Sequence, residues 1–66
     1  MSIVKVVINH QIDWVHSGLS QYEALRLACK AMRVLPYVRW ERAGDNARKC
    51  IRPIEEGLEE RLVVVY

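Results

Sequence analysis

The fold is decided first by residues 3–15, IVKVVINHQIDWV, in which two β-rich runs are separated only by Asn9-His10. In the first run every second residue from Val4 is apolar, whereas the intervening set contains Lys5. The Val4 set is therefore expected to face the core, because a slip of one residue would bury the lysine. Asparagine tolerates the positive φ that a tight turn requires. The stretch predicts a β-hairpin.

A helix is predicted directly after the hairpin, because Ser20-Gln21-Tyr22-Glu23 has the form of a capping box. In such a box the Ser20 hydroxyl accepts from the Glu23 backbone N–H, and the Glu23 carboxylate accepts from the Ser20 N–H. Pro36 ends the helical pattern, since it forces the preceding residue into an extended conformation. The apolar residues that recur at helical spacing, and are predicted to face the core, are Tyr22, Leu25, Cys29 and Met32.

Three β-type stretches follow the helix, at residues 37–42, 47–52 and 61–66, with turn sequences between them. The valine run of the last stretch is typical of a strand buried on both faces, so we expect it in the centre of the sheet, beside residues 3–8. A right-handed crossover through the helix would make these two strands parallel neighbours. The whole pattern predicts an α+β fold: a ββαββ(β) mixed sheet packed on one helix.

Length and composition limit what the chain can be. Its 66 residues form one domain, and a hydrophobic share of 52% is too high for a disordered tail. The net charge of +2 is too small to indicate nucleic-acid binding by itself. No run approaches the roughly 20 apolar residues of a membrane span, and no basic leader precedes the first strand. We expect a cytoplasmic protein.

Residues suited to catalysis or metal binding are few. His10 falls in a turn and His16 at a strand end, and Asp13 is not placed to form a dyad with either. Cys29 and Cys50 lack the spacing of a zinc or redox site, so both are interpreted as packing residues, with a disulfide between them left open. No Gly-rich phosphate loop is present. We expect no catalytic residue, no metal and no cofactor.

The order of elements resembles that of ubiquitin-like β-grasp domains, and most closely the bacterial ubiquitin-like domains of the multi-ubiquitin type. The likeness rests on the segments Ile12-Asp13-Trp14, Ser20-Gln21-Tyr22-Glu23-Ala24-Leu25, residues 37–44, and Gly57-Leu58 before residues 62–66. It implies one ubiquitin-like domain over residues 1–66. The domain would be a modifier or a docking module, recognised by activating and conjugating enzymes and without catalytic activity of its own. Such modifiers act through a C-terminal tail, so a conjugation tail is expected beyond Tyr66 and is absent from this sequence.

A protein-binding face is predicted on the side of the sheet away from the helix. Aliphatic residues beside an aromatic residue and an arginine are typical of contact hot spots, and the resemblance implies recognition through this same face. The residues assigned to it are Lys5, Val7, Tyr37, Arg39, Val63 and Val65. The residues predicted to pack on the helix instead are Val4, Val6, Ile8, Ile12, Trp14, Val38, Trp40, Leu62 and Val64, with Leu58 also reaching the core.

Two other functions stay open. A small phage or mobile-element protein that blocks a host enzyme would also be a short chain without motifs. A single-stranded nucleic-acid binder would combine basic and aromatic residues on its strands; the residues concerned are Arg39, Arg42, Arg48, Lys49 and Arg52, with Tyr37 and Trp40. The acidic residues at positions 55–60 count against it, and so does the expected burial of Trp40.

Overall fold

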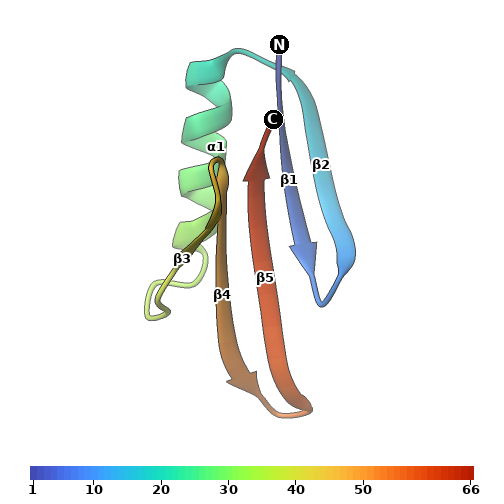
Figure 1. Ribbon diagram of the computed structural model, residues 1–66, viewed down its shortest axis with the longest axis vertical. Coiled ribbons are helices and arrows are strands. Elements are labelled where there is room, and N and C mark those ends of the chain that lie inside the picture. Colours follow the sequence, from blue (N-terminus) through green and yellow to red (C-terminus); the bar gives the residue numbers. More distant parts are fainter.

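One helix lies across one face of a five-stranded sheet (Figure 1). The computed structural model describes all 66 residues, Met1–Tyr66. The strand order across the sheet is β2-β1-β5-β4-β3. The predicted α+β class is confirmed as a small β-grasp-like fold with the last strand beside the first. The elements in chain order are β1 (Ser2–Ile8), β2 (Gln11–Leu19), α1 (Gln21–Arg33), β3 (Glu41–Gly44), β4 (Ala47–Ile54) and β5 (Gly57–Val65).

All four strand pairings are antiparallel, including that of β1 with β5. The predicted parallel pair, and with it the mixed sheet, is wrong. The reason is that five connections separate β1 from β5 and each one reverses the chain direction, so the two strands run in opposite directions (Figure 1). A single helical crossover between them would have kept them parallel.

The β1–β2 hairpin turns at Asn9 and His10, whose φ values of 50° and 67° both lie in the left-handed region. This confirms the predicted two-residue turn. Asn9 also joins the turn to β5. Its backbone N–H donates to the Glu60 carbonyl at 2.9 Å, and its side-chain Oδ1 accepts from the Glu60 N–H at 2.9 Å. One asparagine therefore closes the hairpin and holds it against the central strand.

An irregularity in β2 changes which residues reach the core. Trp14 lies opposite Val6, but Ile12 lies opposite Val7, so β2 carries one extra residue at this point. Such a bulge turns the next side chain to the other face. Trp14 packs against the core as predicted. The predicted core position of Ile12 is wrong, and its side chain is 62% exposed.

The capping box of α1 is formed as predicted. The Glu23 N–H donates to the Ser20 hydroxyl at 3.1 Å, and the Ser20 N–H donates to the Glu23 carboxylate at 3.2 Å. The helix face that meets the sheet differs from the predicted one, because Leu25 is half-exposed and Ala24 and Ala28 are buried. Alanines leave room for the helix to approach a sheet that already carries valines. Of the predicted stripe Tyr22, Leu25, Cys29 and Met32, only Met32 packs against the core.

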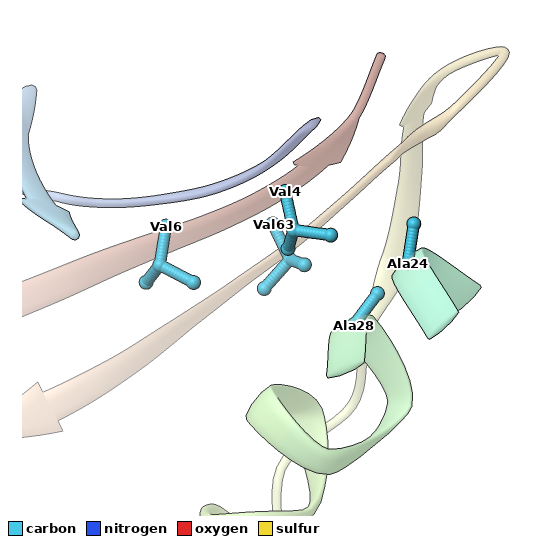
Figure 2. Close-up of a cluster of buried hydrophobic side chains, with 5 residues drawn as sticks. All are labelled: Val4, Val6, Ala24, Ala28 and Val63. Atoms are coloured by element: carbon cyan, nitrogen blue, oxygen red, sulfur yellow. The ribbon is translucent and has the colours of Figure 1, made fainter. Parts of the chain in front are cut away.

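The core is small and lies between α1 and the two central strands. Figure 2 shows the side chains of Val4 and Val63 on the sheet near the two buried alanines of α1, with Val6 farther along the sheet in the same cluster. Val4 and Val6 are buried as predicted. Only 6 of the 66 residues are buried. With so few buried residues, the single chain has only a small hydrophobic interior.

The side chains of β5 face the opposite sides of the sheet from those predicted, so the phase of this strand is reversed. Val63 lies opposite Val6 and Val65 opposite Val4, so both face the helix, whereas Leu62 and Val64 point to the far side. Leu58 is exposed and does not reach the core. Residues 62–65 are all apolar, so the run itself has no alternation that could define the core side. The two-residue turn between β4 and β5 sets the phase, since it places Gly57 opposite Ile54.

Residues 37–40 form a loop rather than the start of a strand, and β3 begins only at Glu41. Only residues 41–44 have a partner, in the first residues of β4. Trp40 nevertheless packs against the core, as predicted, from the end of this loop. Tyr37 is 99% exposed.

Candidate protein-binding face

The side of the sheet away from α1 has no layer of the protein over it (Figure 1), and we call it the open face. Residues directly opposite each other in an antiparallel pair share a face. Because Val4, Val6 and Val63 face the helix, their neighbours in sequence face away from it. The apolar residues of the open face are Ile3, Val7, Ile12, Val15, Ala47, Ile51, Leu58, Leu62, Val64 and Tyr66.

The open face is apolar across four adjacent strands. In its central row Ile12, Val7 and Leu62 lie side by side from β2 through β1 to β5. At the two sides of the face Val15 on β2 and Ile51 on β4 are 51% and 55% exposed. Single exposed apolar residues are ordinary, but a contiguous patch of them marks a contact surface.

The charges on the open face balance one another. Glu41 and Lys49 are opposite each other on β3 and β4. Lys5 places its Nζ 5.1 Å from the centre of the Tyr66 ring, a cation–π distance. Glu60 lies opposite Ile51. Two lysines and two glutamates therefore accompany the apolar residues, and the charges of these four side chains cancel.

The structure brings together only part of the predicted binding set. Lys5 and Val7 lie on the open face. Val63 and Val65 face the helix, and Tyr37 and Arg39 lie in the loop before β3. The residues that the prediction missed are Leu62 and Val64, which take the places assigned to Val63 and Val65, and Ile12, which the β2 bulge turns outward. Exposed Val15 and Ile51 complete the face, and their outward positions follow from β-strand alternation alone.

A compact ion network occupies the helix side of the sheet, where the β4–β5 hairpin extends past the end of α1 (Figure 1). The Glu59 carboxylate accepts from Arg61 Nε at 2.6 Å and from Arg52 Nε at 3.1 Å. Only 13% of the Glu59 side chain is exposed. The hydrogen bond from Arg61, and then that from Arg52, hold the pKa of Glu59 below its ordinary value. This network links β4 to β5, and it pairs two of the basic residues, Arg52 and Arg61, with a carboxylate.

Both cysteines are free thiols in different surroundings. Cys50 is buried on the helix side of β4, opposite Arg61, and burial raises the pKa of its thiol. Cys29 is exposed on α1. A buried thiol with a raised pKa stays protonated and reacts slowly. Cys50 therefore acts as a packing residue and not as a reactive thiol.

Only part of the basic and aromatic set of the nucleic-acid alternative lies together, since Tyr37, Arg39, Lys49 and Arg52 line one pocket. Arg48 and Arg52 lie on the helix side of β4, whereas Lys49 points to the open face. Arg42 is paired with Asp45 at 3.3 Å, and Trp40 packs against the core. A strand-tracking groove needs a row of free cations beside exposed rings. Beside the exposed Tyr37, Arg52 is already paired with Glu59 and Lys49 lies opposite Glu41.

The other predicted features can be placed briefly. His10 lies in the β1–β2 turn, and His16 and Asp13 lie in β2, all three exposed. No group of three or more His, Cys, Asp or Glu side chains is arranged to hold a metal ion. The single helix is too short to cross a membrane. No protein-family model, curated protein or solved structure matches this chain.

Proposed function

We propose that this protein is a protein-binding module without catalytic activity, and that the open face is its docking surface. The observation that carries the proposal is the contiguous apolar patch across four strands, with exposed residues at both sides. A patch of this kind in a small protein is typical of an interaction site. Its balanced charge favours a neutral, apolar protein surface as the partner, over nucleic acid or an anionic membrane.

A charge-neutral double substitution tests the docking surface. Val15→Glu and Ile51→Lys place new charges opposite Lys5 and Glu60 respectively, so each is compensated across the strands and the fold should be kept. The matched control is Leu25→Glu with Val34→Lys, at residues that are 52% and 66% exposed but lie outside the open face.

Immobilised chain would be incubated with extract of its native cells, and the retained proteins identified by mass spectrometry. The open-face variant should lose proteins that the wild type and the control both retain. Identical sets of retained proteins for all three chains would contradict the proposal.

The finer form of the proposal is a cytoplasmic ubiquitin-like modifier, whose open face is recognised by activating and conjugating enzymes. In that case the chemistry of conjugation belongs to the partners. The antiparallel β1–β5 pair counts against this form, because the fold predicted for it is a mixed sheet in which these two strands are parallel. An N-terminal affinity tag on the gene at its native locus, which keeps any residues encoded after Tyr66, would decide the matter. Covalent adducts of higher mass support a modifier, whereas their absence leaves a docking module alone.

A further inference from the structure

We infer that the partner of the open face is a second copy of the same chain. Two open faces stack face to face, with the helices outside, and form a four-layer dimer. This inference rests on the proposed docking function and names its partner. Three properties of the face support it: the area of the molecule, the balance of charge, and the geometry of the sheet.

The first support is the exposed area of the single chain. Its accessible surface is 5052 Å². A folded monomer of 7.7 kDa is expected to expose about 4,300 Å². The excess of roughly 700 Å² is close to the ~800 Å² that each partner buries in an interface of standard size. Burying one standard-size interface on the chain would therefore bring it to the exposure of an ordinary small domain.

The second support is electrostatic. In a two-fold dimer both chains use the same face. A face whose charges all have one sign would therefore repel its copy. The open face has two lysines and two glutamates, and Lys49 already has Glu41 opposite it. The outer surface of α1 also exposes apolar residues, Tyr22 and Leu25, but these lie among Arg26, Lys30 and Arg33. That second surface would repel its copy, whereas the open face would not.

The third support is the geometry of the sheet. Side chains that stand out from two stacked sheets interdigitate when the sheets lie about 10 Å apart. Val7, Leu62 and Val64, on the two central strands, supply branched apolar side chains to the middle of the face. Lysine stems are long enough to carry their charges toward the rim of such a contact, and Glu41 lies opposite Lys49. The face can thus bury its centre without burying unpaired charge.

Sedimentation velocity over about 1 to 500 µM chain tests the dimer, a range that begins near micromolar, the weak limit of affinity for interfaces of this size. The wild type should pass from 7.7 kDa to twice that mass as the concentration rises. The open-face variant Val15→Glu/Ile51→Lys should remain at the monomer mass. The control variant Leu25→Glu/Val34→Lys should dimerise like the wild type.

Circular dichroism checks that each variant is folded. If the open-face variant is unfolded, the milder Ile51→Ser replaces it and Leu25→Ser becomes its control. These two residues are almost equally exposed. A wild type that stays monomeric throughout, or a dimer that the open-face variant retains, overturns the inference. Monomeric wild type that still captures extract proteins through the open face refutes only the second copy. Monomeric wild type with no loss of capture in the variant refutes the docking function as well.

Discussion

Truncating two adjacent valines of β5 tests which face of this strand lies against the helix. Val63 is 3% exposed and belongs to the core, whereas its neighbour Val64 has no layer of the protein above it. Val63→Ala removes two buried methyl groups, at about 0.8 kcal/mol each for transfer alone. The cavity left behind raises the expected loss to about 2–3 kcal/mol. Val64→Ala should cost less than about 1 kcal/mol.

Urea unfolding, followed by tryptophan fluorescence and far-UV circular dichroism, measures both losses. Domains of this size rarely have more than about 3–5 kcal/mol of stability, so Val63→Ala should remove about half of it. With a urea slope near 1 kcal/mol/M, the unfolding midpoint should fall by about 2–3 M. Work at about 1 µM chain keeps self-association from adding to the stability of the wild type. A larger loss for Val64→Ala than for Val63→Ala would place Val64 against the helix and refute the observed phase of β5.

Three further predictions concern the ion network, the thiols and the helix cap. Because the pKa of Glu59 is lowered in the folded state, its ionised form stabilises the fold at pH values above the ordinary glutamate pKa of about 4.3. This stabilisation is lost as the pH falls through the lowered pKa of the folded state. Wild type should accordingly lose stability more steeply below about pH 4.3 than Glu59→Gln in acid titrations followed by circular dichroism, and parallel curves would contradict the role of Arg61. Native chain treated with a maleimide should label rapidly at Cys29 and, until urea unfolds it, only slowly at Cys50; equal rates by peptide mass spectrometry would show that Cys50 is not buried. Ser20→Ala should lower the free energy of unfolding by about 1 kcal/mol, with Ser20→Asp near wild type, and an unchanged urea midpoint for the alanine variant would mean that the cap contributes nothing.

The candidate site could be predicted from the sequence only where a charge marks the phase of a strand. In β1, Lys5 identifies the exposed set, and Lys5 and Val7 do lie on the open face. In β5 the apolar run has no such mark, and the predicted open-face positions of Val63 and Val65 are wrong. The predicted core position of Ile12 is wrong for another reason, since the β2 bulge is defined only by the pairing of β2 with β1.

The sequence by itself determined the features that depend on a few neighbouring residues. The Asn9-His10 turn, the Ser20–Glu23 capping box and the order of the main β-rich and helical segments each follow from short-range sterics and hydrogen bonds. Only the tertiary structure decided the direction of β1 relative to β5, the phase of β5 and the face of α1 that is buried. These depend on contacts between residues far apart in the chain. There the fit of the α1 alanines against the sheet valines outweighs the hydrophobicity of the Leu25 stripe, which local pattern alone had favoured.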